Sequence, residues 1–305
     1  MALAWGPHRD RNPDVDVFSV DVFSMKIPER LQPLVDDGLI DHVIRPLKSG
    51  KEAAIYVVST GGEIRCAKIY KDTNKRGFRQ AALYREGRSV RNSRRARAME
   101  SGTRYGRREQ EDAWQSAEVR ALYHLAEAGV RVPRPYCFLY GVLLMELIVD
   151  SDDNAAPRLA DLNLTEPQAV AYHQTVMTEV ARMLCAGMVH GDLSEYNILV
   201  DTAGPVIIDL PQTVDASANN NAAALFIRDV DHLAAYFGRF APALLATDYG
   251  REIWALYKNG LLQPDTILTG RYSSADTLVD VGAVMREIDA AREEERLRRQ
   301  RLNGS

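Results

Sequence analysis

An aspartate and an asparagine stand five positions apart in the segment HGDLSEYNILV, residues 190–200. Transfer of a phosphoryl group requires a carboxylate that orients or deprotonates the acceptor hydroxyl, and it requires oxygen ligands for Mg²⁺. Asp192 and Asn197 have the D-x-x-x-x-N spacing of a kinase catalytic loop. Asp192 would orient or deprotonate the hydroxyl, and the amide oxygen of Asn197 would bind the metal. His190 fits a structural role in orienting the loop. Taken singly, each residue would equally fit a polar turn before a strand.

A further oxygen ligand, Asp209, follows Asn197 after twelve residues and lies in the apolar run VIIDLPQ. A carboxylate at the end of an apolar strand is costly to bury without a partner, and Mg²⁺ would supply one. By itself Asp209 could be a strand-end cap. The spacing of Asp192, Asn197 and Asp209 together favours phosphate chemistry.

A phosphate site also needs a cation and a backbone cradle. Lys68 lies in the strand-like run IRCAKIY, where its ammonium could reach the α- and β-phosphates, although an exposed strand lysine is the common alternative. Glu118, in a predicted helix, is the expected partner of Lys68 and is preferred to Glu111. The string SGKE, residues 49–52, precedes the first strand. Backbone N–H groups beside a glycine can cradle an anion, and the alternative is an ordinary turn.

The elements that must position these residues change character along the chain. Strands are predicted for AIYVV, IRCAKIY, two runs around Gly141, NILV and PVIIDL, because these runs are rich in β-branched and apolar residues. Helices are predicted within the residue ranges 25–47, 112–130, 165–187, 222–241 and 249–260. Strands first and helices later indicate an α+β protein with a β-rich and then an α-rich lobe.

Composition sets broad limits. The chain has 305 residues, 46% of them hydrophobic and 26% charged, which is typical of a globular protein with a real core. The longest apolar run, VLLMELIV, is short and interrupted by Glu146, so no membrane span is expected. The three cysteines, Cys66, Cys137 and Cys185, are far apart and indicate buried reduced thiols of a cytoplasmic protein.

Charge is distributed unevenly. Residues 71–110 carry 13 Lys and Arg against 4 Asp and Glu, although the whole chain has a net charge of −4. Such a segment could contact ribosomal RNA or another polyanion, or it could be a solvated loop. Residues 1–24 have no apolar core of a secretory signal and are predicted to be a disordered tail, with Met25 as a hypothetical start of translation.

Several of these strings together resemble one known family. SGKEAAIYVV, AKIYK, LLMELI followed by APRL, VHGDLSEYNIL and VIIDLPQ are similar to the RIO family of atypical protein kinases, in the type-one subfamily and its bacterial form. The similarity spans about residues 25–260. It implies a bilobal protein-kinase-like fold with an N-terminal lobe over 25–148, including a helical extension and the basic flexible loop. A minimal C-terminal lobe would cover 149–285 and a charged helical tail 286–305.

The resemblance also implies roles for individual residues. Asp192 would be the catalytic aspartate, and Asn197 and Asp209 the ligands of Mg²⁺, or alternatively Mn²⁺. Asp209 could also accept phosphate as an aspartyl-phosphate. Residues expected to bind ATP are Ser49, Gly50, Lys51 and Glu52 in the phosphate loop, Ile55, Lys68 with Glu118, and Met145, Glu146 and Ile148 at the adenine. Autophosphorylation would fall on serines of the basic loop, with Ser89, Ser93 and Ser101 as candidates.

Departures from ordinary protein kinases keep alternatives open. HGD replaces HRD, DLP replaces DFG and no APE follows, so we expect no activation loop and no peptide-docking subdomains. Small-molecule phosphotransferases of the aminoglycoside or choline kinase kind share the H-G-D-x-x-x-x-N loop, and only the SEYN and SGKEA strings argue against them. A second alternative is an ATP-gated ribosome-assembly factor. The protein substrate cannot be read from the sequence.

Overall fold

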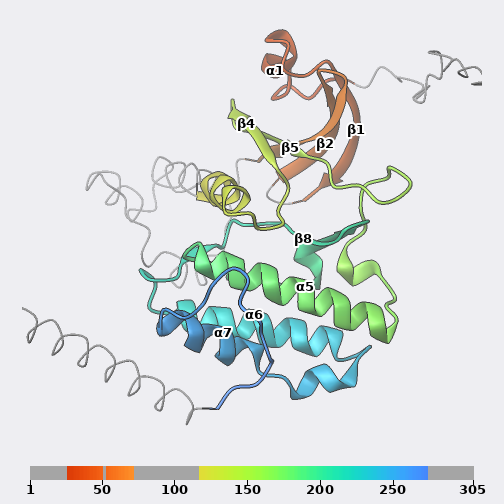
Figure 1. Ribbon diagram of the computed structural model, residues 1–305. Coiled ribbons are helices and arrows are strands. Elements are labelled where there is room, and N and C mark those ends of the chain that lie inside the picture. Colours follow the sequence, from red (N-terminus) through yellow and green to blue (C-terminus); the bar gives the residue numbers. More distant parts are fainter. Residues whose placement is uncertain (1–25, 51–52, 72–116, 274–305) are drawn as a thin grey trace, which may run out of the picture.

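The computed structural model describes residues 26–50, 53–71 and 117–273. In this part of the chain an antiparallel sheet forms one lobe and a group of helices forms the other (Figure 1), which confirms the predicted bilobal α+β class. The predicted tails, 1–24 and 286–305, lie outside the described residues, as does the basic segment after Lys71. The lobe boundary at 148/149 stays a prediction.

The five strands of the sheet follow the order β1-β2-β3-β5-β4. Their bounds are β1 (His42–Ser49), β2 (Ala53–Thr60), β3 (Glu63–Tyr70), β4 (Pro135–Leu139) and β5 (Val142–Glu146). The two predicted hairpins are therefore present. Gly61 and Gly62 join β2 to β3 with φ of 60° and 80°, and Gly141 joins β4 to β5 with φ of 73°. Glycine adopts these left-handed angles without the steric cost that a Cβ would bring.

The helix predicted within residues 25–47 is much shorter than expected. Helix α1 covers only Gln32–Asp36 and is followed by Gly38, whose φ of 69° suits a helix C-terminus. From His42 onward the chain is the edge strand β1, so the helical prediction was wrong there. Val43 and Ile44 are β-branched, and pairing with β2 satisfies the backbone of this segment.

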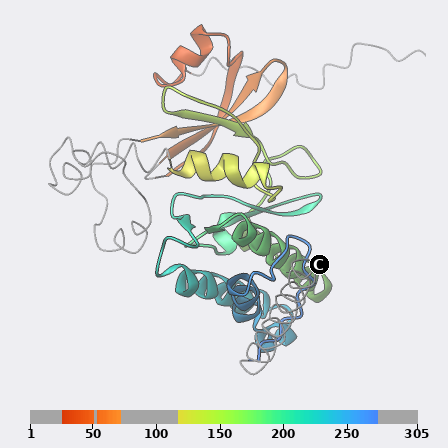
Figure 2. The same cartoon turned by 60° about the vertical axis from the view of Figure 1, so that its left-hand side comes forward.

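Strand β3 separates two cores because its side chains alternate between the faces of the sheet. Ile69 packs with Leu34 of α1 in one buried cluster, whereas Tyr70 belongs to the larger cluster shared with the helix over 117–127. Lys68 shares the face of Tyr70. Figure 2 shows this helix, in yellow, between the sheet and the α-helical lobe. The alternation thus directs Lys68 towards the helix that carries Glu118.

The second lobe is built on three helices, α5 (Glu166–Cys185), α6 (Ala222–Phe237) and α7 (Tyr249–Lys258). All three were predicted. Thr165 and Gln168 form a reciprocal capping box at the start of α5, where the side chain of each bonds the backbone N–H of the other. Above the helices lies the hairpin of β7 (Ile198–Asp201) and β8 (Gly204–Ile207), labelled at β8 in Figure 1.

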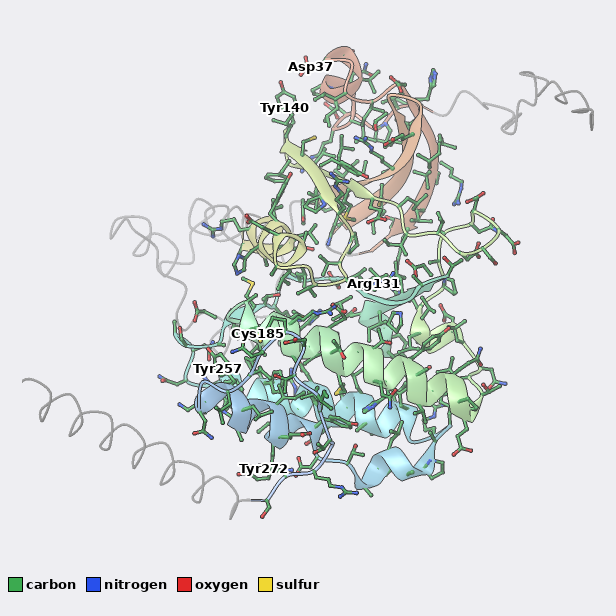
Figure 3. The ribbon with its side chains drawn as sticks, viewed as in Figure 1. Asp37, Arg131, Tyr140, Cys185, Tyr257 and Tyr272 are labelled. Carbon is green, nitrogen blue, oxygen red and sulfur yellow. The ribbon has the colours of Figure 1, made fainter. Side chains whose placement is uncertain are left out.

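Arg131 joins the two lobes, and Figure 3 shows it at their junction. Its guanidinium binds both carboxylate oxygens of Asp201, at 2.9 and 2.7 Å. Its backbone N–H donates to Oε2 of Glu179 on α5 at 2.8 Å, and its carbonyl accepts from the N–H of Ile207 at 2.9 Å. The segment after the 117–127 helix is therefore fixed to both α5 and β8.

The cysteine prediction holds only in part. All three cysteines are free thiols, but only Cys66 is buried, and Cys137 and Cys185 are partly exposed. Burial raises the pKa of Cys66 to about 12, against the opposing charge of Lys68, so this thiol stays protonated and unreactive. Among the described residues, no helix combines the length and apolar character that crossing a membrane requires.

Candidate active site

Lys68, Glu118 and Asp209 come together between the lobes. The ammonium of Lys68 lies 2.5 Å from Oε1 of Glu118 and 3.6 Å from Oδ1 of Asp209. Burial alone would lower the pKa of Lys68, but the two carboxylates outweigh it and raise that pKa. Lys68 is therefore a charged lysine held in a mostly buried place, with Asp209 half exposed beside it. The pairing of Lys68 with Glu118 agrees with the sequence prediction, whereas the alternative, Glu111, lies outside the described residues.

Tyr70 completes the surroundings of this ion pair. It is 3% exposed, its ring centroid is 5.3 Å from the Lys68 ammonium, and no hydrogen bond to its hydroxyl is found among the described residues. Burial raises the pKa of Tyr70, and the carboxylates of Glu118 and Asp209 raise it further. The phenol therefore stays neutral and supplies an uncharged wall to the site.

The catalytic-loop candidates lie between β6 (Met188–Val189) and β7. A 3₁₀ turn, η2 (Glu195–Asn197), follows the loop residue Asp192. The side-chain amide of Asn197 donates to the carbonyl of Asp192 at 2.9 Å, which closes the five-residue spacing into a compact turn. Because the amide nitrogen is engaged in this way, the carbonyl oxygen of Asn197 is the atom that remains suited to a metal. The Asp192 carboxylate is exposed, and its Oδ2 accepts from Nε2 of Gln212 at 3.0 Å.

The β7–β8 hairpin brings Asp209 to the same end as Asn197. Ile198 pairs with Ile207, and the N–H of Ile208 donates to the carbonyl of Asn197 at 2.9 Å. Asp209 follows with φ of 66°, a left-handed angle that is uncommon outside glycine. This angle turns the chain sharply out of the apolar strand, so the carboxylate is exposed rather than buried with the strand.

Asn197 and Asp209 fit a magnesium ion by the chemistry of their donors. Mg²⁺ prefers oxygen ligands and usually takes one or two from the protein, keeping water or phosphate oxygens as the others. The described residues contain no group of three or more His, Cys, Asp and Glu side chains that could hold a metal on their own. Water or phosphate oxygens would complete a site that takes two ligands from Asn197 and Asp209.

Helix α6 fixes the loop through Asp229, a residue that sequence reasoning missed. Asp229 is 3% exposed, and its Oδ2 accepts from the N–H of Gly191 at 2.9 Å. Arg228 bonds both the Gly191 carbonyl and Oδ1 of Asp229. Burial raises the pKa of Asp229, opposed by Arg228, His190 and a backbone bond from Leu193. An acidic residue on the apolar face of ALFIRDVDHLAAYF was the available signal.

His190 has the structural role that was predicted. Its Nδ1 accepts from the N–H of Asp192 at 3.3 Å, and its Nε2 lies 3.1 Å from the carbonyl of Ile208. The imidazole thereby connects the catalytic loop to the strand that leads to Asp209.

The expected nucleotide residues are spread along the sheet. Lys51 and Glu52 lie outside the described residues, whereas Ser49 and Gly50 are described. The ammonium of Lys71 donates to Ser49 Oγ and to the Gly50 carbonyl, both at 2.8 Å. Lys71 was not anticipated. Its two hydrogen bonds connect the start of the expected phosphate loop to the residue that follows strand β3, on which Lys68 lies.

Ile55 lies on β2, whereas Met145 and Glu146 lie at the end of β5 and Ile148 follows shortly after it. Ile55 of β2 pairs with Lys68, and Met145 pairs with Cys66 across β3 and β5. Glu146 ends β5, and Ile148 packs in a small cluster with Val206 of β8. These positions place the adenine candidates along the chain that connects the two lobes.

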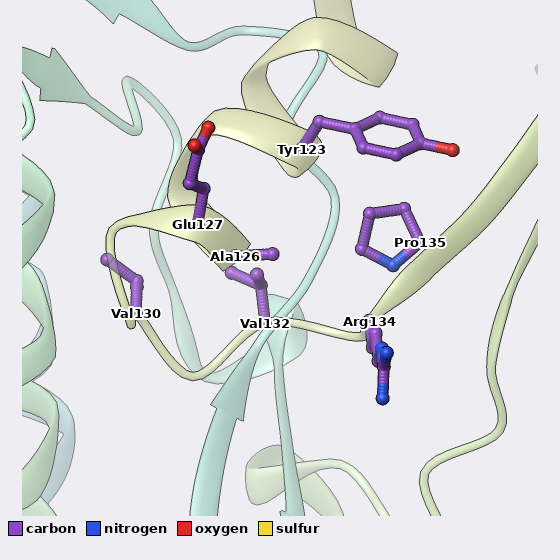
Figure 4. Close-up of a pocket in the computed structure, with 7 residues that line it drawn as sticks. All are labelled: Tyr123, Ala126, Glu127, Val130, Val132, Arg134 and Pro135. Atoms are coloured by element: carbon purple, nitrogen blue, oxygen red, sulfur yellow. The ribbon is translucent and has the colours of Figure 1, made fainter.

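A separate pocket of about 470 Å³ opens on the outer side of the 117–127 helix. Figure 4 shows its lining, which comes from the C-terminal half of this helix and the chain leading into β4. The lining includes Tyr123, Glu127 and Arg134 but none of the candidate catalytic or nucleotide residues. The pocket is therefore distinct from the candidate active site.

The lobes, the Lys–Glu–Asp cluster and the D-x-x-x-x-N loop define a protein-kinase-like phosphotransferase site. Comparison with known families gives a match to the RIO domain over residues 54–249. The chain therefore belongs to the RIO family, which confirms the resemblance found in the sequence.

Relatives of this chain occur in archaea and eukaryotes. The chain is 35% identical over 234 residues to the RIO-type serine/threonine-protein kinase Rio1 of Haloferax volcanii, covering 76% of each protein. It is 31% identical over 210 residues to the human serine/threonine-protein kinase RIO1, covering 68% of this chain and 35% of the human protein. For rio1 of Schizosaccharomyces pombe the identity is 28% over 219 residues, with 71% and 42% covered. The chain thus spans less than half of these two eukaryotic relatives.

Proposed function

We propose that the protein is an ATP- and Mg²⁺-dependent atypical serine/threonine kinase of RIO type. One observation carries the proposal: Lys68 is held at 2.5 Å by Glu118 and lies 3.6 Å from Asp209, at the end of the hairpin that begins with Asn197. A buried cation beside a half-exposed carboxylate suits a ligand that brings both phosphate oxygens and a metal.

Each residue then has a distinct task. Lys68 binds phosphate oxygens, and Glu118 keeps its ammonium in place. Asp192 orients the acceptor hydroxyl and accepts its proton as the oxygen bonds to the γ-phosphorus and the bond from that phosphorus to the leaving ADP breaks. Asn197 and Asp209 would hold Mg²⁺, or Mn²⁺, which when bound neutralises charge on the phosphates.

Nucleotide recognition is proposed along the sheet edge. Ser49, Gly50, Lys51 and Glu52 would surround the phosphates, with backbone N–H groups as donors. The adenine would lie against Ile55 and Met145, with the carbonyl of Glu146 and the amide of Ile148 as its hydrogen-bond partners. The pairing of Ile55 with Lys68 and the packing of Ile148 against the second lobe support this assignment.

The destination of the phosphate distinguishes the possible activities. Transfer to serine gives autophosphorylation, with Ser89, Ser93 and Ser101 as candidate sites outside the described residues. Transfer to Asp209 would form an acyl-phosphate and release ADP, and water would then release inorganic phosphate. Incubation with γ-labelled ATP and Mg²⁺, followed by phosphosite mapping, separates them because neutral hydroxylamine cleaves an acyl-phosphate and leaves phosphoserine intact.

The central test is Asp192→Ala. We expect phosphoryl transfer to fall by about 10²-fold or more while ATP still binds, because only the positioned carboxylate is lost. Asp209→Asn should weaken Mg²⁺-dependent ATP binding and remove any acyl-phosphate. Asp265→Ala, which changes an exposed aspartate of the second lobe, is the matched control. Near-normal transfer by Asp192→Ala would contradict the proposal.

A second candidate is an ATP-gated factor that contacts ribosomal RNA or the ribosome, in the cytoplasm, through residues 71–110. The excess of Lys and Arg in this segment favours it. Binding through phosphates should weaken steeply with salt. Reversing the charges of Arg91, Arg94, Arg95 and Arg97 should abolish the association. Unchanged association would exclude this role, and efficient turnover of an aminoglycoside or choline without autophosphorylation would instead indicate a small-molecule phosphotransferase.

A further inference from the structure

Gln212, from the string DLPQ, makes a side-chain contact with the proposed catalytic aspartate. Its Nε2 donates to Oδ2 of Asp192 at 3.0 Å, across twenty positions of sequence. A neutral amide donor that binds one carboxylate oxygen restricts rotation of the carboxylate and leaves the other oxygen, Oδ1, for a further partner.

The backbone around Gln212 is held in place independently of this bond. Strand β9 (Val214–Asp215) pairs antiparallel with β6, so that Val189 lies opposite Val214. This register places the residue two positions before Val214 beside the loop that starts after Val189. Thr213, which is 5% exposed, donates both its N–H, at 3.1 Å, and its hydroxyl, at 2.8 Å, to the carbonyl of Leu210.

The charged groups around this contact are already engaged. His190 bonds the Asp192 N–H, and Arg228 and Asp229 of α6 bond Gly191. Asp209, three positions before Gln212, faces Lys68. Among the described residues, the amide of Gln212 is therefore the side chain that binds the Asp192 carboxylate itself.

We propose that Gln212 is a positioning residue, which holds Oδ2 of Asp192 so that Oδ1 faces the acceptor hydroxyl. This inference rests on the proposed function, because it concerns how the catalytic carboxylate of that reaction is aimed. A side chain that acts only through the Asp192 carboxylate affects the chemical step rather than nucleotide binding. Its loss should therefore lower kcat and leave ATP affinity unchanged.

The isosteric variants separate orientation from packing. Gln212→Met keeps the length of the side chain but removes the donor, and Gln212→Glu keeps its shape but places a second carboxylate against Asp192. We expect kcat to fall by about tenfold in Gln212→Met and by about 10²-fold in Gln212→Glu. If Gln212 only filled space, Gln212→Glu would retain the activity of the unchanged protein.

The assay is the initial rate of phosphate release and autophosphorylation at saturating Mg²⁺-ATP, with the ATP dissociation constant measured separately. Gln32 provides a matched control pair, because its Nε2 donates to Asp36 at 2.8 Å on the exposed surface of α1. Gln32→Met and Gln32→Glu should leave kcat unchanged. Equal kcat in the unchanged protein and both Gln212 variants would overturn the inference.

A crystal structure with Mg²⁺ and a non-hydrolysable ATP analogue gives a readout that does not depend on turnover. We expect one Asp192 rotamer in the unchanged protein and a different or mixed rotamer in Gln212→Met. The same single rotamer in both would overturn the role of Gln212 even if the protein is an active kinase. Absence of phosphoryl transfer in the unchanged protein, with the rotamer change present, would instead overturn the proposed function alone.

Discussion

His173 on α5 should make the stability of the second lobe depend on pH. It is fully buried, and neither ring nitrogen has a hydrogen-bond partner within the described part of the chain. The imidazole packs edge-on against Phe237 and Tyr249, with ring centroids 5.5 and 5.2 Å away. Burial among these rings lowers the pKa of His173 from 6.5 to about 4, because a charged imidazolium there would lose its hydration.

The sign and size of the effect follow from this pKa. Between pH 6.5 and 4 the unfolded chain takes up a proton at His173 and the folded protein does not, so stability falls as the pH falls. Each pKa unit corresponds to 1.36 kcal/mol. The contribution lost is about 2 kcal/mol between pH 7 and pH 5, and about 3 kcal/mol below pH 4.

The perturbation is His173→Leu, which keeps similar volume and cannot be protonated. Urea unfolding at pH 7 and pH 5 should show the stability of the unchanged protein falling by about 2 kcal/mol more than that of the variant. Comparing how the free energy of unfolding of the two proteins changes with pH removes the contribution of the carboxylates, because both proteins contain the same carboxylates. His232→Gln, at an exposed position of α6, controls for the loss of a histidine. Equal pH slopes in the unchanged protein and His173→Leu would refute the reasoning.

Two further predictions concern contacts that hold the site. Asp229→Ala should reduce the free energy of unfolding by about 3 kcal/mol, because it removes the buried carboxylate that accepts from the N–H of Gly191. The measurement is urea unfolding. A free energy of unfolding within about 1 kcal/mol of that of the unchanged protein would contradict this prediction. Arg131→Met and Asp201→Asn should show a coupling of about 1 kcal/mol in a double-mutant cycle of unfolding free energies, since one guanidinium nitrogen of Arg131 contacts both oxygens of Asp201 and the pair is partly buried. Strictly additive effects would mean that the pair does not connect the lobes energetically.

Local patterns were sufficient for most elements of the fold. The glycines between β2 and β3 and between β4 and β5, and the Thr165 cap of α5, determine turns and a helix start from neighbouring residues alone. The same approach failed over residues 42–47, which lie inside the segment expected to be helical. Pairing with β2, which starts shortly afterwards at Ala53, makes these residues part of a strand.

The candidate site likewise contains some residues that local sequence patterns identify and some contacts that they do not. The spacing of Asp192 and Asn197 and the apolar run before Asp209 could be recognised from the sequence, because a short loop and a hairpin keep these residues near one another. The contacts of Asp229 with Gly191 and of Gln212 with Asp192 join residues 38 and 20 positions apart. No local pattern specifies which polar side chain will reach a given loop.

The sequence by itself determined the family, most of the strands and helices, the residue types able to handle phosphate and the pairing of Lys68 with Glu118. The tertiary structure alone decided that Asp209 lies beside that pair, that Asp229 anchors the catalytic loop, and that Gln212 reaches Asp192. The physical reason is that hydrogen bonds and ion pairs act over a few ångströms, whereas the partners they join are separated by long stretches of chain that only packing brings together.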